Sequence, residues 1–299
     1  MRHLLYLINP ISGTRGKSDL QQLAIAQTKK AGFEVSVLPS SANGDYQYAI
    51  EYIQKNKVTD IVIAGGDGTV SQAVNAMKHL NLDFGIIPCG SGNGLALAAG
   101  IPGSPKAALD LIFSGKSRKT DGFLLNDQFA CMLCGLGFDA KVAHDFAQQP
   151  KRGLANYVKM VVRNFFSART WSFELTVKGK TFSTDAYFIS IANSNQFGNN
   201  FTIAPKASLR DGLLDVVIVS KQNKLQVLLS TFFQLRGKRS LQMDSMIDKD
   251  KAVVYFQTDS FQLKNLSGAP LHIDGDPADS PVELDLQVLP GCFKLIGGK

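Results

Sequence analysis

The sequence predicts a two-domain protein, with an N-terminal α/β domain on a parallel sheet and a C-terminal, mostly antiparallel β-sandwich. Up to about residue 115, short apolar runs alternate with segments of helical periodicity, the pattern of a parallel sheet flanked by helices. From about residue 121, strands follow one another with little helix between them. No Gly/Ser linker separates the halves. We therefore expect domains at 1–122 and 123–299 with a cleft between them, and allow the last strand, about 286–299, to return to the first domain.

In the first domain, apolar runs predict the strands and the i, i+3, i+4 spacing predicts the helices. The expected strands are 4–8, 33–38, 61–64 and 84–87, and the expected helices are 18–31, 46–53, 70–77, 95–99 and 105–114. In the second domain the expected strands are 129–138, 171–177, 182–192, 213–219, 253–258, 261–266, 271–273 and 282–288. Helical periodicity there is limited to about 154–165 and 225–235.

The amino-acid composition limits the kinds of function that the chain can have. The chain is 44% hydrophobic and 19% charged, an ordinary globular mixture, and its net charge is +7. A basic chain suits an anionic partner such as a nucleotide or an acidic lipid surface, although the charge is spread along the sequence. No apolar run approaches the roughly 18 residues that a membrane span needs, so we expect a cytoplasmic protein. The four cysteines fit that compartment, and Cys131 and Cys134 are expected to be buried strand residues rather than a metal or redox pair.

The stretch after the strand at 61–64 predicts a phosphate site. Gly65–Gly68 form a turn before a helix, and Thr69 with Gln72 has the spacing of a capping box. Glycines let the backbone approach a ligand closely, and a helix N-terminus presents free N–H groups to an anion. No Gly-Lys-Ser/Thr follows, so the turn is not a Walker loop. A carboxylate among these glycines, Asp67, repels phosphate unless it holds a metal ion or accepts a proton.

Three further turns of small or polar residues are expected at the carboxyl ends of neighbouring strands. They are Asn9–Gly13, Ser40 and Gly90–Asn93. Ligands of parallel α/β sheets bind at that edge. Two glycine turns at successive strand ends, together with Asn9–Gly13, therefore indicate a polyphosphate ligand.

Three polar clusters interrupt the second half of the chain. Asp121 lies at the domain junction, Ser208–Asp215 precedes and enters a strand, and Asp274–Pro277 follows one. Asp-Gly pairs are ordinary turn residues. Asp276 stands out because a carboxylate on a tight turn can project from the β domain toward a cleft.

The order of these motifs resembles that of the diacylglycerol kinase catalytic-domain family, which includes bacterial diacylglycerol kinase-like proteins and sphingosine and ceramide kinases. The matching segments are Asn9–Gly13, Gly65–Thr69, Gly90–Asn93, Gly135–Asp139, Ala204-Pro205 with Asp211–Asp215, Asp274–Pro277 and Pro290-Gly291. The Gly65–Thr69 motif alone is shared with NAD kinases and phosphofructokinases, whose nucleotide-binding domain the first half would therefore resemble. The resemblance implies an ATP-dependent kinase that phosphorylates a lipid hydroxyl.

The resemblance also implies roles for individual residues. Asp276 would be the general base and Asp121 an acidic residue that supports it. Asp67 would organise Mg²⁺ or water at the phosphates, with the role of base as a competing assignment. A structural magnesium site would use the carbonyls of Ser208 and Leu213 and the carboxylate of Asp211. The ATP site would be lined by Asn9, Pro10, Ser12, Gly13, Ser40, Gly65, Gly66, Asp67, Gly68, Thr69, Val70, Ser71, Ser91 and Asn93.

Two departures from the family pattern bear on the reaction. Asp276 stands where the family more often has glutamate, which sets its carboxylate back by about one C–C bond. The Gly90–Asn93 loop has the form seen in the sphingosine and ceramide kinase branch, so the acceptor lipid stays open.

Other functions remain as alternatives. The nearest is a kinase of a soluble small molecule, such as NAD, and another is a non-catalytic nucleotide- or lipid-binding protein. Nucleic-acid binding lacks a recognition motif. A lipid kinase without a membrane span must contact the bilayer peripherally, and Phe165, Phe166 and Arg169 at the end of a basic helix are candidates for that contact. A homodimer is left open.

Overall fold

The computed structural model divides into two compact units. The first is Met1–Gly122 with Pro290–Lys299, and the second is Phe123–Leu289. The structure describes residues 1–10, 17–90, 92–147, 164, 168–196, 204–220 and 253–298.

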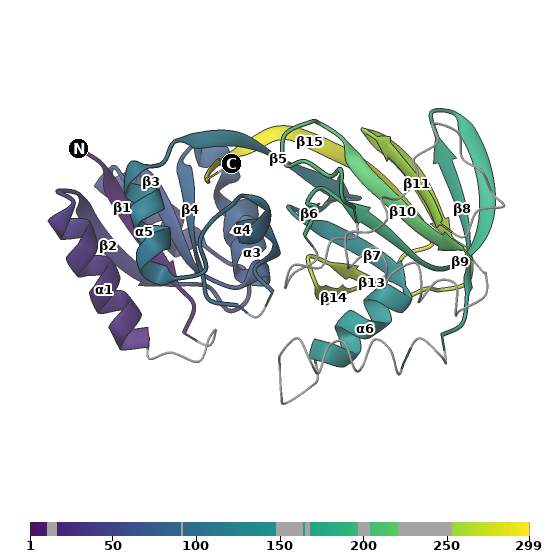
Figure 1. Cartoon of the computed structure of the whole chain (residues 1–299), viewed down its shortest axis with the longest axis horizontal. Coiled ribbons are helices and arrows are strands. Elements are labelled where there is room, and N and C mark those ends of the chain that lie inside the picture. The colour runs from purple at the N-terminus through teal and green to yellow at the C-terminus, as the bar shows by residue number, and fades with distance from the viewer. Residues whose placement is uncertain are drawn as a thin grey trace. The chain divides into compact units, whose positions relative to one another are not determined.

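A parallel sheet forms the centre of the first unit (Figure 1). Its strand order is β2-β1-β3-β4-β15, and each neighbouring pair is parallel. This arrangement confirms the predicted α/β domain. The strands are β1 (His3–Ile8), β2 (Glu34–Pro39), β3 (Asp60–Gly65), β4 (Asp83–Pro88) and the last part of β15 (Glu283–Ile296).

Helices cover this sheet. They are α1 (Lys17–Lys30), α2 (Gln47–Asn56), α3 (Asp67–Met77), α4 (Gly94–Ala98) and α5 (Pro105–Ser114), with a 3₁₀ turn at Lys78–Leu80. α1 and α5 contact each other over one face of the sheet (Figure 1). Every residue of β1 and β3 is buried, as expected for central parallel strands covered on both faces. The apolar runs that predicted these strands are therefore the core of the unit.

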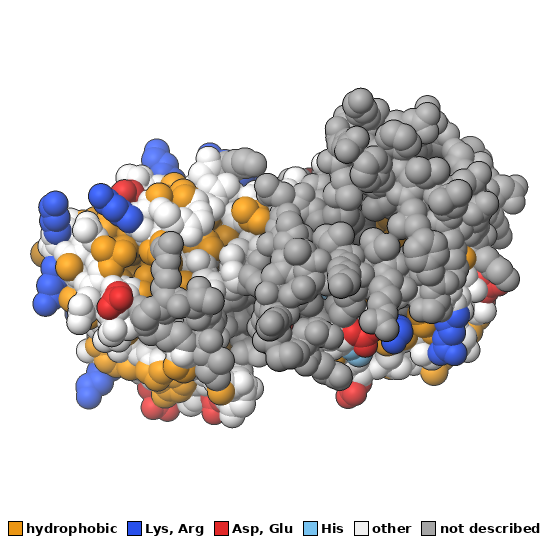
Figure 2. All heavy atoms as spheres, turned by 60° about the horizontal axis from the view of Figure 1, so that its bottom comes forward, with side chains coloured by type: hydrophobic (Ala, Val, Ile, Leu, Met, Phe, Trp, Pro, Cys, Tyr) orange, Lys and Arg blue, Asp and Glu red, His pale blue; other side chains and the backbone are white. Residues whose placement is uncertain are grey.

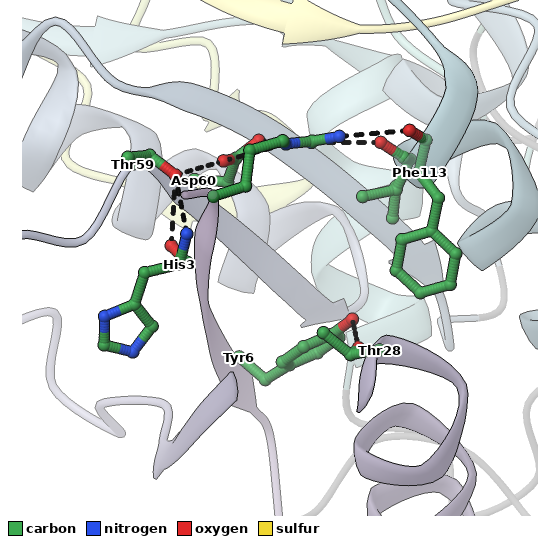
Figure 3. A network of polar contacts seen from close by, with 8 residues as sticks. His3, Tyr6, Thr28, Thr59, Asp60 and Phe113 are labelled. Atoms are coloured by element: carbon green, nitrogen blue, oxygen red, sulfur yellow. Dashed lines mark hydrogen bonds and ion pairs between the residues drawn. The ribbon is translucent and has the colours of Figure 1, made fainter. Parts of the chain in front are cut away.

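A polar network closes the amino ends of β1 and β3 (Figure 3). The Arg2 guanidinium forms an ion pair with the buried Asp60 carboxylate and also donates to the last carbonyls of α5. Thr59 donates to Asp60 at 2.6 Å and receives the backbone N–H of His3 at 2.9 Å. The network ties β1, β3 and α5 together at the edge of the sheet opposite the glycine turns.

Antiparallel strands make up most of the second unit. Its pairings β7–β9, β8–β9, β9–β10, β10–β11, β8–β12, β12–β15, β7–β13 and β13–β14 are all antiparallel. The strands are β6 (Gln128–Ala130), β7 (Leu133–Gly137), β8 (Trp171–Val177), β9 (Lys180–Ala192), β10 (Leu214–Ser220), β11 (Val253–Thr258), β12 (Ser260–Asn265), β13 (Leu271–Ile273), β14 (Asp276–Ala278) and the first part of β15. β5 (Ser117–Leu125) pairs with β6 and β15.

Some predicted elements differ from those observed. The single strand expected at 129–138 is wrong: the segment contains the end of β6, then β7, and at Phe138 the start of helix α6 (Phe138–Ala147). Gly137 has a φ of 88°, which turns the chain out of the strand. The helices predicted at 154–165 and 225–235 lie outside the described residues, apart from position 164. Among the helices of the described ranges, none is long and apolar enough to cross a membrane.

Candidate active site

Four turns lie at the carboxyl edge of the parallel sheet. Asn9 follows β1, Ser40 follows β2, Gly65 ends β3 with Gly66 directly after it, and Gly90 lies just beyond β4. Parallel pairing places these strand ends side by side. Of the remaining residues predicted at this edge, Ser12, Gly13 and Ser91 lie outside the part of the chain that the structure describes.

Asn9 connects the first turn to the third. Its backbone N–H donates to the Ala64 carbonyl at 3.0 Å, and its side-chain amide donates to the Thr69 hydroxyl at 2.7 Å. Thr69 lies inside the first turn of α3. The N-cap of this helix is Gly66, and no side chain caps it with a hydrogen bond. The predicted capping box is wrong, because the helix begins at Asp67, two residues before the expected cap.

The glycines allow two turns to touch. A Cβ on Gly90 would lie 2.6 Å from the Cα of Gly66, and a Cβ on Gly65 would lie 2.7 Å from the Thr69 Cβ. Both separations are far below van der Waals contact. A larger residue at position 90 would push the β3–α3 and β4–α4 turns apart, and one at position 65 would displace Thr69 within the β3–α3 turn. The glycines therefore have a packing reason to be present, in addition to any ligand that they admit.

Asp67 and Asn93 hold the β4–α4 turn. The Leu95 N–H donates to the Asp67 carboxylate at 3.4 Å, which links the start of α4 to the start of α3. Asn93 accepts the Gly90 N–H and donates to the Gly90 carbonyl, both at 2.8 Å. Asn93 has a φ of 52°, a left-handed conformation that asparagine tolerates better than most residues. These contacts give both side chains a structural role at this edge.

Ser40 provides an unusual polar group at the end of β2. Its backbone N–H donates to the Ile8 carbonyl, but its buried hydroxyl has no hydrogen-bond partner among the described residues. A buried hydroxyl without a partner is costly and is often completed by a ligand or water. Val70 and Ser71 are buried in α3, and the Val70 N–H is used by the helix itself.

Asp121 is a buried residue of β5. Its carboxylate accepts the backbone N–H of Gly291 at 2.7 Å. Gly291 has a φ of 57° and lies within β15, so the contact fixes an irregular point of that strand. Both residues belong to the first unit.

Asp276 lies in the second unit. It is the first residue of β14 and directly follows the two-residue turn that joins β13 to β14. Asp274 and Gly275 form the turn with φ values of 49° and 89°, and Ile273 pairs with Asp276 across it. Two residues with positive φ match the tight hairpin turn that Asp-Gly favours. Asp276 is exposed, as the sequence predicted for a carboxylate projecting from the β domain.

Asp274 is the main anchor of this turn, a role that sequence reasoning missed. Its buried carboxylate accepts the backbone N–H groups of Cys131, Met132 and Leu133 at 2.9–3.0 Å. Its own N–H donates to the Leu133 carbonyl at 2.8 Å. The donors lie more than 140 residues earlier in the chain, so no local pattern could reveal them. The three contacts fix where Asp276 emerges.

The predicted metal residues form a loop before β10. Ser208 and Asp211 are exposed, and they accept the N–H groups of Arg210 at 3.3 Å and Leu213 at 3.1 Å respectively. Nearby, the pKa of Asp215 is raised to about 7, chiefly by burial; the hydrogen bond from Gln257 opposes the shift, and the neighbouring Asp211 carboxylate adds to it. Within the described ranges, no group of three or more His, Cys, Asp or Glu side chains could hold a metal ion. The hydroxyl, carboxylate and carbonyl oxygens of the loop are of the type that Mg²⁺ prefers.

Two family models match the chain. The one described as the diacylglycerol kinase catalytic domain matches residues 3–124, and the YegS C-terminal NAD kinase beta sandwich-like domain matches residues 133–297. The second match confirms that the antiparallel unit is the predicted β-sandwich.

Individual relatives and a solved structure agree with these matches. A diacylglycerol kinase of Bacillus subtilis (strain 168) is 28% identical over 284 residues, covering 92% of this chain and 90% of the relative. A "Probable lipid kinase YegS-like" protein of Shewanella frigidimarina is 24% identical, covering 99% and 94%. A crystal structure of a diacylglycerol kinase from Bacillus anthracis covers 99% of this chain and 97% of its own, with a TM-score of 0.75 and 20% identity. At that identity the structural likeness supports the fold.

Proposed function

Because the chain belongs to the diacylglycerol kinase catalytic-domain family, we propose that it transfers the γ-phosphoryl group of ATP to the hydroxyl of a membrane lipid. Family membership makes the chain a phosphotransferase with an alcohol acceptor. We propose in addition that ATP is the phosphoryl donor and that the acceptor alcohol is a membrane lipid. The observation that carries the proposal is the match of both family models to the two units, with the polar glycine turns at the carboxyl edge of the parallel sheet.

The triphosphate of ATP would bind at that carboxyl edge. The first turn of α3 presents backbone N–H groups and a positive dipole end, which favours an anion. The Ser40 hydroxyl, buried and without a partner among the described residues, supplies a donor or acceptor that a nucleotide could satisfy. The remaining proposed contacts are those implied by the resemblance: Asn9, Pro10, Ser12, Gly13, Gly65–Ser71, Ser91 and Asn93.

Asp276 would act as the general base. A lipid hydroxyl is a weak nucleophile until its proton is removed, and a carboxylate within hydrogen-bond reach can accept that proton. Asp274 supports the assignment because its three backbone contacts hold the turn before Asp276 in one conformation. Asp121 is the proposed supporting acid, and in the first unit its carboxylate accepts the Gly291 N–H of β15.

Asp67 would organise charge at the phosphates. Its carboxylate lies beside the start of α3, where an acid near phosphate needs a cation or a proton. When bound, Mg²⁺ neutralises phosphate charge in phosphoryl transfer. A second, structural Mg²⁺ would be held by oxygens of Ser208, Asp211 and Leu213, which suit this hard cation.

The lipid acceptor implies peripheral contact with a bilayer. The net charge of +7 favours an anionic surface. On the face drawn in Figure 2, the lysines and arginines of the described residues are dispersed among acidic and apolar side chains. Of the candidate docking residues, Arg169 is exposed and packs over the Trp171 ring, whereas Phe165 and Phe166 lie outside the described residues.

The test is a phosphoryl-transfer assay with γ-labelled ATP. The purified protein is offered diacylglycerol, sphingosine and ceramide in mixed micelles, with NAD as a soluble acceptor. We expect label in a lipid product and none in NAD. Label in NAD alone would replace the proposal with a soluble-substrate kinase, and ATP binding without transfer to any acceptor would indicate a non-catalytic protein.

Replacing the proposed base tests its role. Asp276→Ala should reduce kcat by at least about 10³-fold, because no other group would accept the hydroxyl proton. ATP affinity, measured by calorimetry, should change by less than about threefold. Asp279→Ala, which removes an exposed aspartate three residues further along, is the matched control and should keep kcat within about twofold. Substantial activity in Asp276→Ala would transfer the role of base to Asp67 or another group.

A further inference from the structure

A buried histidine–aspartate pair lies beneath the turn that carries Asp276. His272 belongs to β13 and is 1% exposed, and Asp139 is a buried residue in the first turn of α6. The His272 Nε2 lies 3.2 Å from the Asp139 carboxylate. Neither residue has a role in the proposed nucleotide site, although Asp139 ends the Gly135–Asp139 motif.

The second ring nitrogen of His272 contacts the turn itself. The backbone N–H of Gly275 donates to Nδ1 at 3.3 Å. An amide N–H can only donate, so Nδ1 must carry the lone pair and accept. Nε2 then carries the proton of the neutral ring and donates it to Asp139. Asp139 therefore selects the His272 tautomer that can accept from Gly275.

Gly135 explains why this pair fits inside the sheet. It lies opposite His272 in the pairing of β7 with β13. A Cβ on Gly135 would be 2.6 Å from the His272 Nε2, and it would also collide with the Asp139 carboxylate. Glycine at this position is thus required by the buried pair. Gly135 and Asp139 serve the same local structure, which accounts for two residues of the motif.

We propose that Asp139 and His272 are positioning residues that set the orientation of Asp276. Asp274 fixes one side of the turn through Cys131, Met132 and Leu133, and His272 fixes the other side through the Gly275 N–H. Gly275 directly precedes Asp276, so a change in the Gly275 peptide is transmitted to the Asp276 backbone. This inference rests on the proposed function, in which Asp276 accepts a proton from the lipid hydroxyl.

Two amide substitutions separate the functions of the two ring nitrogens. The amide oxygen of asparagine can occupy the position of Nδ1, so His272→Asn keeps an acceptor for Gly275 and gives up the contact with Asp139. The longer glutamine reaches the position of Nε2, so His272→Gln keeps the contact with Asp139 and gives up the acceptor. We expect kcat to fall at least about tenfold in His272→Gln and less than about threefold in His272→Asn, with KM for ATP within about twofold in both. Equal kcat in the two variants overturns the proposal.

Amide hydrogen exchange at Gly275 gives a readout that does not depend on kinase activity. Exchange should be at least about tenfold faster in His272→Gln than in the wild type or in His272→Asn. Unchanged exchange in His272→Gln overturns the contact. If the wild type labels no lipid, the proposed function fails, while the exchange measurement still decides whether His272 holds the turn.

A second pair of variants covers the case in which His272→Gln folds poorly. Asp139→Asn keeps an oxygen that can accept from Nε2 and should retain kcat within about threefold. Asp139→Leu removes the acceptor and should lose at least about tenfold in kcat, with faster exchange at Gly275. Equal kcat and equal exchange in Asp139→Asn and Asp139→Leu contradict a positioning role for the pair.

Discussion

The two edges of the parallel sheet use similar residues for different purposes. At the amino edge, Asp60 is buried and paired with Arg2, and Thr59 donates to the same carboxylate. At the carboxyl edge, Asp67 is only partly buried and receives an amide at 3.4 Å, and the Ser40 hydroxyl has no partner among the described residues. Asp60 is the first residue of β3, and Asp67 lies just beyond the other end of the same strand.

The difference indicates which edge can take a ligand. A carboxylate that is saturated by an ion pair and hydrogen bonds contributes to the fold and is closed to new partners. Turns of glycine, serine and asparagine with an incompletely satisfied hydroxyl leave polar groups that a ligand could use. We therefore expect substitutions at the amino edge to change stability and substitutions at the carboxyl edge to change nucleotide binding or turnover.

The largest expected effect on stability is at the amino edge. Asp60→Ala should lower the free energy of unfolding by about 3 kcal/mol, because it removes the anion that pairs with the Arg2 guanidinium and the carboxylate that accepts from the Thr59 hydroxyl. Urea denaturation measures the change. The exposed Asp19→Ala is the control and should stay within about 0.5 kcal/mol of the wild type. A stable Asp60→Ala protein with impaired ATP binding would reverse the assignment of the two edges.

The matching substitution at the carboxyl edge should act on catalysis. Asp67→Asn should reduce kcat for labelled lipid formation about 100-fold, since it removes the charge that would organise the cation at the phosphates. The amide oxygen can still accept the Leu95 N–H, so the free energy of unfolding should change by less than about 1 kcal/mol. A loss of stability comparable with that of Asp60→Ala would show that Asp67 is chiefly structural.

A substitution in the glycine turns should have an intermediate effect on both the free energy of unfolding and ATP affinity. Gly90→Ala places a Cβ 2.6 Å from Gly66, so the turns must separate; we expect about 1–2 kcal/mol of destabilisation and about tenfold weaker ATP binding by calorimetry. Gly103→Ala is the control, because an added Cβ there has no atom within 4 Å. Equal ATP affinity in Gly90→Ala and Gly103→Ala would remove the β4–α4 turn from the nucleotide site.

The smallest expected effect concerns a single hydrogen bond beneath β1. Thr28 donates to the Ala24 carbonyl and so accepts from the buried Tyr6 hydroxyl at 2.6 Å (Figure 3). Burial raises the pKa of Tyr6 to about 12, so the hydroxyl stays protonated at neutral pH. Tyr6→Phe should cost about 1 kcal/mol of unfolding free energy with ATP affinity unchanged. A double-mutant cycle with Thr28→Val checks the coupling, and a value near zero would contradict the assignment.

Much of the fold could be predicted because its strands are continuous apolar runs. The runs that became β1, β3 and β4 are buried on both faces, so each residue contributes to the same pattern. β5 was not predicted, because it starts with Ser117-Arg118-Lys119 and has no such run. The sequence does not predict α6, because the apolar residues before it extend the predicted strand through Gly135 and Gly137 to Phe138.

The candidate site was predictable only where a local motif carries it. The glycine turns and the Asp274–Asp276 turn are visible as short patterns, and the structure places the described glycine turns at one sheet edge. The contacts that fix Asp274 and His272 come from residues more than 130 positions earlier in the chain. The sequence contains those residues, but their meeting is a property of the antiparallel sheet.

We propose that the carboxyl edge of the parallel sheet binds ATP while the amino edge maintains the fold. Hydrogen exchange with and without Mg·ATP, followed by mass spectrometry, tests it most directly. We predict slower exchange in peptides covering 65–71 and 89–95, with no change in peptides covering 1–5 and 57–61. Protection at the amino edge, or none in the glycine turns at saturating ATP, would contradict the account.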